Sequence, residues 1–505
     1  MADLQRIHSK DSVAVALRPV AKGEHLSFED RTLDVADAIP PGHKIALKDI
    51  ARGETVFKYG YPIGRAKVPI VRGSHVHTHN LQTMLSESAE YHYDPAAQTE
   101  QRKESPPVIE AYKRGDGKIG IRNEIWIIPT VGCVNKTAEL LAHWGDAELQ
   151  SVDGVYAWTH PYGCSQMGED HETTRRILAN LALHPNAGAV LIVGLGCENN
   201  TIESFKTLLG DFEPDRIAFM TTQQCDDEIA EGKKLLTRLA AYAASFKREQ
   251  VDASALIIGM KCGGSDGFSG ITANALVGRV CDRLAAMGAT AILTEVPEMF
   301  GAEQMLMDRC ENAQVFEKTV SLIRDFKDYY VKHGQVVYEN PSPGNKEGGI
   351  TTLEDKSCGC VQKGGTAPVR AVYRYGERIT SAPQTTAAKQ ATTAGGLALL
   401  EGPGNDIVST TAMTAAGAQI ILFTTGRGTP VGAPVPTIKI ASNTALAAKK
   451  SSWIDFDAGR MLSEDVEAVC ANMLQLLWNT ASGKLTKNET NGYREIAIFK
   501  NGVTL

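Results

Sequence analysis

The sequence predicts an α/β protein in which a small N-terminal β module precedes parallel-sheet α/β domains. Residues 1–92 hold short β-rich runs separated by glycine and proline turns, which is the pattern of a small all-β unit. Beyond residue 108, apolar runs of strand length alternate with helix-like stretches, as is typical of βαβ units. A length of 505 residues is enough for about three domains. We therefore expect one β module and two α/β domains.

The expected β module occupies residues 1–92, and a linker follows at 93–107. The clearest strand-like runs of the module are residues 13–17, 44–47 and 55–59. The linker is polar and contains proline, which favours an extended crossover between domains.

Three histidines alternate along the chain near the end of the module. His75, His77 and His79 lie in the segment GSHVHTHN, and alternate positions of a strand point to one face of it. Three imidazoles on one face can bind a divalent transition metal ion. An exposed polar strand edge explains the same pattern, so both interpretations stay open.

The two α/β domains are expected at residues 108–248 and 249–505. Helix-like stretches at 135–144 and 226–247 stand between strand-like runs. Strands that alternate with helices in this way form parallel sheets. The predicted strands are residues 124–128, 154–158, 189–193, 255–258, 290–293 and 419–423.

Each of these predicted strands ends in a polar or glycine-rich tip. The richest tip is KCGGSDGFSGITAN at 261–274, where glycine lets the backbone approach a ligand closely. Ligands of open α/β sheets bind at the carboxyl ends of the strands, so we expect all the tips to share one active-site rim. The other tips are TVGC at 130–133, THPYGC at 159–164, GLGCE at 194–198, TEVPE at 294–298 and TTGRGTP at 424–430.

Four cysteines directly follow predicted strands. A free cysteine is usually a small buried hydrophobe. Cysteines at four matching positions are also suited to a metal ion or an iron-sulfur cluster. Cys358 and Cys360 are too close together to indicate a zinc site, and we predict a turn there. The four cysteines at the tips are Cys133, Cys164, Cys197 and Cys262.

Three basic residues and one histidine are candidates for contact with an anionic substrate. Arg122, Arg427 and Lys346 each lie close to glycine in a non-helical segment, and arginine can bind a carboxylate through two parallel hydrogen bonds. His160, at a strand tip, could carry a proton near neutral pH. Solvated surface charges and a core histidine are the alternative interpretations.

The amino-acid composition limits which binding partners and which cellular compartment we expect. A net charge of −7 does not indicate a basic surface that binds nucleic acid. The chain has no apolar signal core at its N-terminus and no apolar run near the ~18 residues that span a bilayer. We expect a cytoplasmic protein with ten free cysteines and a small-molecule substrate. The oligomeric state, a homo-oligomer included, is left open.

Eight short segments carry a more specific signal. They are GHKIAL at 42–47, HVHTHN at 75–80, GIRN at 120–123, HPYGC at 160–164, GLGCEN at 194–199, CGGSD at 262–266, NPSPGNK at 340–346 and TGRGTP at 425–430. With these motifs the chain resembles the altronate/galactarate dehydratase family, over essentially its whole length. The segment EVPEMFGAE at 295–303 is closer to the altronate branch than to the galactarate branch.

The resemblance implies both an architecture and an activity. It implies a SAF-type β domain at the N-terminus, a second domain and a C-terminal α/β domain. The implied reaction is dehydration of D-altronate to 2-dehydro-3-deoxy-D-gluconate, with Fe²⁺ or Mn²⁺ as the activating ion. An iron-sulfur cluster on the four tip cysteines remains an alternative to an ion bound by His75, His77 and His79.

In such a dehydration a proton leaves the carbon beside a carboxylate and a hydroxide leaves the next carbon. A metal ion or an arginine clamp stabilises the developing enediolate, while a base and an acid move the protons. The catalytic candidates are His160, Lys346, Glu198 and Asp266. The expected substrate contacts are His43, Lys44, Arg122, Asn123, Ser265 and Arg427. A galactarate dehydratase, a related sulfo-lyase and a non-catalytic sugar-acid-binding protein remain alternatives.

Overall fold

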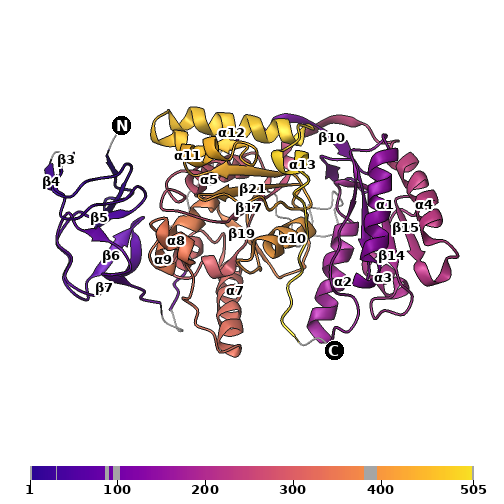
Figure 1. Cartoon of the computed structure of the whole chain (residues 1–505), viewed down its shortest axis with the longest axis horizontal. Helices are drawn as coiled ribbons and strands as arrows, with labels where there is room; N and C mark the ends of the chain where they lie inside the picture. The colour runs from indigo at the N-terminus through magenta and orange to yellow at the C-terminus, as the bar shows by residue number, and fades with distance from the viewer. Residues whose placement is uncertain (1–2, 30, 86–89, 95–102, 380–394, 503–505) are drawn as a thin grey trace.

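The computed structural model describes residues 3–29, 31–85, 90–94, 103–379 and 395–502. The C-terminal domain lies in the middle of the molecule, between the N-terminal β module and the second α/β domain (Figure 1). The predicted fold class, a small β module followed by parallel-sheet α/β domains, is confirmed. Part of the predicted linker, residues 95–102, lies outside the described residues. No helix of the described residues is long and apolar enough to cross a bilayer.

The N-terminal module is built from short antiparallel strands. Apolar side chains such as Leu26, Leu33 and Ile45 fill its core. The four-stranded sheet has the order β1-β2-β5-β8, and a two-stranded and a three-stranded sheet accompany it. The strands are β1 (Leu4–Gln5), β2 (Val13–Ala16), β3 (His25–Phe28), β4 (Arg31–Asp34), β5 (Lys44–Ala46), β6 (Thr55–Lys58), β7 (Tyr61–Ala66), β8 (His75–Val76) and β9 (Leu81–Gln82).

The second domain is a parallel sheet of the order β13-β12-β14-β15 with helices on both faces. Every residue of β14 (Ala187–Gly194) is buried, as expected for a strand that is covered on both sides. Asp227 caps α4 by accepting hydrogen bonds from the Ile229 and Ala230 amides. The other elements are β12 (Glu124–Pro129), β13 (Val155–Ala157), β15 (Ile217–Thr221), α1 (Asn135–Glu148), α2 (Gly168–Ala182), α3 (Ile202–Leu209) and α4 (Glu228–Ala243).

The C-terminal domain contains a parallel sheet of the order β19-β20-β18-β17-β21-β22-β23. From central β17 the chain continues to β18 on one side and later to β21 on the other, so the strand order reverses between β17 and β21. Ligands of such sheets bind at this reversal point. The strands are β17 (Ile257–Cys262), β18 (Thr290–Leu293), β19 (Val369–Tyr373), β20 (Gly396–Leu400), β21 (Ile420–Thr425), β22 (Thr437–Ala441) and β23 (Phe456–Asp457).

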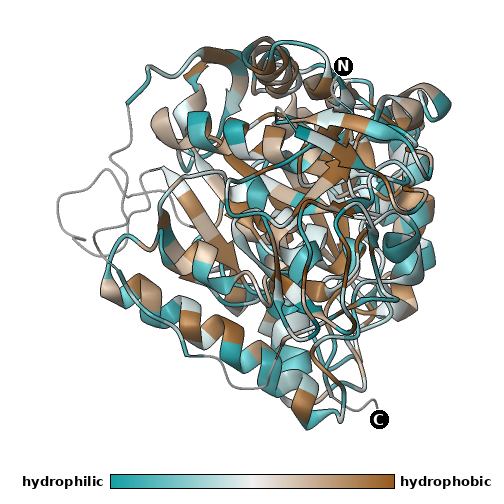
Figure 2. Cartoon of the chain, turned by 90° about the vertical axis from the view of Figure 1, so that its left-hand side faces the viewer, coloured by the Kyte–Doolittle hydropathy of each residue, from teal (hydrophilic) through white to brown (hydrophobic). Residues whose placement is uncertain are grey.

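Helices cover this sheet. Figure 2 shows hydrophobic strands inside the molecule and hydrophilic residues on the helices at its outside. Helix α12 packs on α5, and α10 packs on β17. The helices are α5 (Ala273–Ala286), α6 (Glu303–Met307), α7 (Ala313–Lys332), α8 (Pro343–Glu347), α9 (Leu353–Cys360), α10 (Asp406–Ala416), α11 (Thr444–Lys449), α12 (Val466–Ala481) and α13 (Lys487–Thr490).

The strand predicted at 255–258 is displaced along the chain. Strand β17 begins at Ile257 and continues to Cys262, because Lys261 and Cys262 pair in parallel register with Phe423 and Thr424 of β21. The polar tip therefore begins after Cys262 rather than at Lys261. Cross-strand pairing extended the strand beyond the apolar run on which the prediction depended.

A small antiparallel sheet and the C-terminal tail connect the two α/β domains. β10 (Val108–Lys113) pairs with β11 (Ile119–Gly120) and with β16 (Arg248–Asp252), so β16 spans the boundary expected between residues 248 and 249. In the tail, Arg494 donates hydrogen bonds of 2.8 and 2.9 Å to the two carboxylate oxygens of Glu124 at the start of β12. Both side chains are buried.

We expect Arg494→Met to destabilise the protein strongly, because it leaves the buried Glu124 carboxylate without its guanidinium. Breaking a buried ion pair on one side costs about 3–5 kcal/mol in the free energy of unfolding. Arg460→Met is the matched control, since Arg460 forms an exposed pair with Glu464 that is worth roughly 0.3–0.5 kcal/mol. Urea unfolding measures both. Equal losses for the two variants would contradict the structural role of Arg494.

Candidate active site

The N-terminal module meets the C-terminal domain along a segment at residues 340–360, which contains α8 and α9. His43 Nε2 lies 3.2 Å from the Glu347 carbonyl oxygen, and Lys44 Nζ donates to the Gly349 carbonyl at 2.7 Å. From the other side, Asn345 Nδ2 donates to the Ser265 carbonyl at 2.8 Å. This segment therefore holds the histidines of the module against the carboxyl edge of the C-terminal sheet.

Three histidines of the module converge at this junction, but they are not the predicted three. Ring nitrogens of His43, His75 and His77 all lie within 4.8 Å of one another. His43 was expected to contact substrate, whereas His79 is exposed and lies outside this group, although its ring is 5.5 Å from that of His75.

The extended strand predicted through His79 is wrong, because β8 ends at Val76. The Asn80 side chain accepts a hydrogen bond from the His77 amide at 2.9 Å and donates one to the His75 carbonyl at 2.8 Å. Asparagine side chains that bond to nearby backbone in this way favour turns. The turn carries His79 away from the group.

The histidines of this group have lowered pKa values. Burial, together with neighbouring imidazoles and the Lys44 ammonium, lowers the pKa of His75 to about 4 and that of His77 to about 3. Burial also lowers the pKa of His43. Neutral imidazole is the form that ligates a metal ion. The group therefore fits a transition metal ion at neutral pH.

A buried ion triad joins the module to α9. Asp355 accepts hydrogen bonds from Lys44 Nζ at 2.7 Å and from Lys58 Nζ at 3.1 Å. All three side chains are almost completely inaccessible to solvent. Burial alone would raise the pKa of Asp355, but the two ammonium groups hold it well below its usual range. Lys44, predicted to bind substrate, has a pKa that burial lowers to about 8.

The carboxyl edge of the C-terminal sheet brings four predicted residues to the same junction. Arg427 follows β21, donates to the Gly344 carbonyl at 3.2 Å and pairs with Glu347 at 2.9 Å. Lys346 is half-buried on α8 and makes no side-chain hydrogen bond within the described residues. These two cations can contact an anion. Ser265 and Asp266 complete the edge.

The Asp266 side chain is held by hydrogen bonds to groups of the protein itself. Its carboxylate accepts hydrogen bonds from the Ser269 amide and hydroxyl, from the Ser442 hydroxyl and from the Asn443 amide group. Burial raises the pKa of Asp266, although these hydrogen bonds oppose the shift. The carboxylate ties the end of β17 to the end of β22, which explains its burial without a catalytic role.

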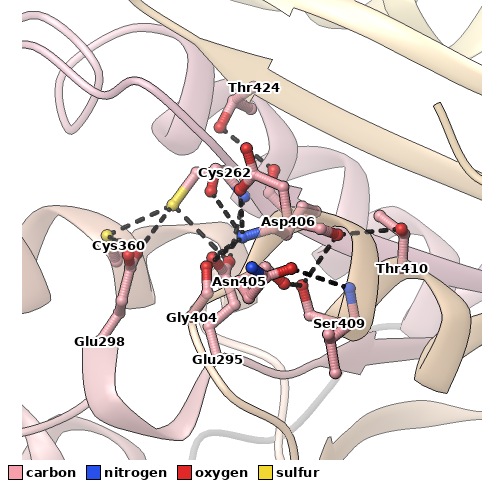
Figure 3. A network of polar contacts seen from close by, with 12 residues as sticks. Cys262, Glu295, Glu298, Cys360, Gly404, Asn405, Asp406, Ser409, Thr410 and Thr424 are labelled. Carbon is pink, nitrogen blue, oxygen red and sulfur yellow. Dashed lines mark hydrogen bonds and ion pairs between the residues drawn. The ribbon is translucent and has the colours of Figure 1, made fainter. Parts of the chain in front are cut away.

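Behind this edge lies a buried network of thiols, carboxylates and ammonium groups. Figure 3 shows the sulfur atoms of Cys262 and Cys360, 3.4 Å apart, converging on the Glu298 carboxylate. Lys363 Nζ donates to Cys262 Sγ at 2.9 Å, and Lys356 Nζ donates to Glu298 at 2.7 Å. A cavity of about 10 Å³, room for roughly one water molecule, touches Lys356, Cys360, Asp266 and Asp355 and so links the network to the ion triad.

The network does not fit a metal ion as it stands. Cys262, Glu298 and Cys360 have ligand atoms within 4.8 Å of one another, which is close enough for one ion. However, the site already holds equal numbers of opposite charges. The carboxylates of Glu295, Glu298 and Asp406 form ion pairs with three ammonium groups, those of Lys261, Lys356 and Lys363. The hydrogen bond with Cys262 and burial raise the pKa of the Cys360 thiol well above its usual value. A cation would meet balanced charge and a protonated thiol, so the histidine group is the better metal site.

Sequence reasoning missed most of this network. Glu295 and Glu298 lay in a recognised tip, but their carboxylates were not selected. Cys360 was expected in a turn, which is wrong, because the Thr352 side chain caps α9 and the helix continues to Cys360. Only the structure reveals the features that mark this network. Every residue of α9 is buried although the helix contains three charged side chains, and Glu295 has left-handed backbone with φ of 68°.

Seven predicted residues lie in the second domain, away from the junction. The tips after β12, β13 and β14 do converge, through bonds such as Gly132 amide to Tyr162 carbonyl at 2.8 Å and Asn200 amide to Gly163 carbonyl at 3.1 Å. They belong to a separate sheet with its own core. The expectation of one shared rim is therefore wrong, and the molecule has two. The seven are Arg122, Asn123, Cys133, His160, Cys164, Cys197 and Glu198.

His160 and Glu198 have structural partners in this second rim. His160 is buried, with Nε2 2.8 Å from the Pro129 carbonyl oxygen and Nδ1 accepting from the Tyr162 amide at 3.1 Å. Burial lowers its pKa to about 4. Burial alone would raise the pKa of Glu198, but hydrogen bonds from Thr130 and from backbone amides lower it overall. Both side chains connect loops, and neither reaches the junction.

Arg122 and Asn123 are also explained without a substrate. Arg122 is almost fully buried and makes two hydrogen bonds, of 2.7 and 3.0 Å, to the Glu489 carboxylate. Asn123 Oδ1 accepts from Arg114 at 2.8 Å, and its Nδ2 donates to the Ala243 carbonyl at 2.9 Å. The Arg122 contact connects the second domain to α13 of the C-terminal domain, whereas the Asn123 contacts lie within the second domain.

The four tip cysteines do not form one site. Cys133, Cys164 and Cys197 are exposed on the second domain, whereas Cys262 is buried in the C-terminal domain among Glu295, Glu298, Cys360 and Lys363. The fold therefore does not support a single iron-sulfur cluster held by all four. All ten cysteines are free thiols.

Comparisons with known proteins match the chain over nearly its whole length. Models for the SAF domain of altronate/galactarate dehydratases, for the second domain of D-galactarate dehydratase/altronate hydrolase and for the C-terminal domain of D-galactarate/altronate dehydratase match residues 2–84, 111–244 and 253–504. The chain is 49% identical to altronate dehydratase of Escherichia coli K12 over 99% of both chains, and 48% identical to that of Bacillus subtilis 168 over 100% of both. It is 32% identical to galactarate dehydratase (L-threo-forming) of E. coli K12, over 98% of this chain and 96% of the relative.

We expect Asp355→Asn to loosen the N-terminal module, because two buried ammonium groups lose their carboxylate. The cost should be about 3–5 kcal/mol. Hydrogen exchange should accelerate at least about tenfold in β5, while β14 of the second domain keeps its rate. Glu54→Gln, which removes an exposed ion pair with Lys48, should change neither the stability nor the exchange rate in β5. Unchanged exchange in β5 of Asp355→Asn would show that the triad does not hold the module.

Proposed function

We propose that this chain, which belongs to the altronate/galactarate dehydratase family, removes water from D-altronate and yields 2-dehydro-3-deoxy-D-gluconate. One observation carries the proposal: two altronate dehydratases match the chain end to end at 49% and 48% identity. Galactarate dehydratase matches the same length at 32% identity, so D-altronate is the better supported substrate.

The junction provides the groups that the reaction needs. A base removes the proton from the carbon beside the carboxylate, the hydroxyl group of the next carbon leaves as water with a second proton, and the resulting enol tautomerises to the 2-keto acid. Negative charge develops on the carboxylate while the first proton leaves, and nearby cations stabilise it. Arg427 and Lys346 are the cations on the open side of the junction.

Lys346 is the proton carrier that we propose. His160, the other candidate, is buried in the second domain with both ring nitrogens engaged. A six-carbon acid is far larger than the 10 Å³ cavity between the ion triad and the thiol network. We therefore place the substrate on the half-exposed side of the junction, beside Lys346 and Arg427, with Ser265 at the same edge.

His43, His75 and His77 would hold the activating ion, Fe²⁺ or Mn²⁺. One candidate ligand nitrogen from each of the three rings lies within 4.8 Å of the others, which is close enough for all three to contact one ion. A bound divalent ion supplies Lewis-acid stabilisation of oxygen atoms that gain negative charge. The protein's part is to keep these imidazoles neutral and converging.

The setting that we propose is the catabolism of hexuronates in the cytoplasm. A 2-keto-3-deoxy sugar acid is a suitable intermediate for later carbon–carbon cleavage, since its carbonyl group activates the adjacent carbon. The free state of all ten cysteines suits a reducing compartment.

A panel of sugar acids tests the reaction. We expect 2-keto acid formation from D-altronate with kcat/KM at least about 100-fold above that for galactarate, because a site built to bind particular hydroxyl groups discriminates strongly. Arg427→Met should raise KM for D-altronate, with Arg460→Met as the control. Saturable binding of D-altronate without turnover in the Fe²⁺-supplemented enzyme would instead identify a sugar-acid-binding protein, and faster turnover of galactarate would favour that substrate.

Metal binding distinguishes the observed histidine group from the predicted one. We expect His77→Gln to lower the affinity for Fe²⁺ by more than about 100-fold, beyond the loss typical of outer-shell changes. His79→Gln should leave it nearly unchanged, since His79 lies outside the group. Anaerobically purified protein should contain no acid-labile sulfide. Equal metal affinities in the two variants would contradict the assignment of His77.

A further inference from the structure

We propose that a pocket in the second domain binds a small organic anion that carries a phosphate or carboxylate group on an apolar body. The pocket has a volume of about 310 Å³, within the range of small-molecule sites. Several residues that line it come just before β14 and β15 or from the β10–β11 turn, so it lies at the amino edge of the domain's sheet. It is thus separate from both rims at the carboxyl ends of strands.

Three arginines line this pocket without a carboxylate partner in the described part of the chain. Arg114 donates to the carbonyl oxygens of Pro185 and Arg122 and to Asn123 Oδ1. Arg216 donates to the carbonyl oxygens of His184 and Ala187. Neutral oxygens hold these two guanidinium groups in place but do not neutralise them. Arg378, the third, forms no ion pair among the described residues.

The positive charges repel one another. Burial and the nearby Arg216 together lower the pKa of Arg114 to about 10. Burial and Arg378 lower the pKa of Arg216, although Asp116 opposes that shift. Asp116 faces this group but is exposed and already paired with Lys118. The carboxylates of Asp211 and Glu213 also line the pocket, on an exposed loop. An oxyanion inside the pocket would relieve the repulsion through charge-assisted hydrogen bonds.

The rest of the wall is suited to an apolar group. Phe212, Tyr242 and Phe246 line the pocket, and the Arg114 guanidinium lies 5.1 Å from the centre of the Phe246 ring. An apolar or aromatic body can pack on these rings while its charged group meets the arginines. The wall combines both domains, because Arg378 follows β19 of the C-terminal domain. A bound anion would therefore connect the two domains.

Titration calorimetry with three probes tests this pocket: inorganic phosphate, phenyl phosphate and benzoate. We expect saturable binding of phenyl phosphate, tighter than that of inorganic phosphate. Benzoate shows whether the pocket accepts a carboxylate group in place of a phosphate group. Arg378→Gln should weaken binding at least about tenfold, since a charged hydrogen bond is lost. Arg238→Gln, at an exposed arginine of α4 outside the pocket, should not.

The unliganded variant supplies an independent measurement. Arg378→Gln removes a repulsive charge, so the melting temperature of this variant without ligand should equal or exceed that of the wild type. Lys118→Gln provides a second variant of the same wall. Absence of saturable binding for all three probes up to 10 mM, as an order of magnitude for weak sites, would overturn the proposal, as would equal affinity in Arg378→Gln. Dehydratase activity is measured separately, so the outcome for this pocket is independent of the proposed function.

Discussion

The buried carboxylate of Asp355 between the ammonium groups of Lys44 and Lys58 is the interaction on which the candidate site depends. It joins segments 311 residues apart, the N-terminal module and α9, where the three side chains are almost inaccessible to solvent. A charge in such a place is tolerated only when it is paired, so the triad has one favourable arrangement. That arrangement also fixes His43, the residue before Lys44, against α8.

Around the triad, burial sets the chemistry of each group. The same loss of solvent that makes the ion pairs specific keeps His75 and His77 neutral. The hydrogen bond with Cys262, together with burial, raises the pKa of the Cys360 thiol. Neutral imidazoles suit a metal ion, whereas the balanced charges of the thiol network do not attract one. The two clusters are both compact, and their charge, rather than their spacing, distinguishes them.

The division into two rims changes how the sequence motifs are interpreted. The motif that contains His160 and the motif that contains Glu198 shape the second domain, and their polar groups are satisfied by local backbone. The motifs around His43, Ser265, Lys346 and Arg427 meet at the junction instead. A motif with catalytic residue types is therefore compatible with a purely structural role when its side chains have partners within their own sheet.

The sequence by itself determined the β module, the parallel strands with polar ends and the family, because hydrophobic periodicity and short motifs are local properties of the chain. It also selected most of the junction residues, such as His75, His77 and Arg427. Only the tertiary structure decided which strand ends share a rim, that His43 replaces His79, and that Glu298 and Cys360 lie together. Those outcomes depend on which sheet a strand joins and on pairing between segments hundreds of residues apart, for which a single sequence contains no local signal.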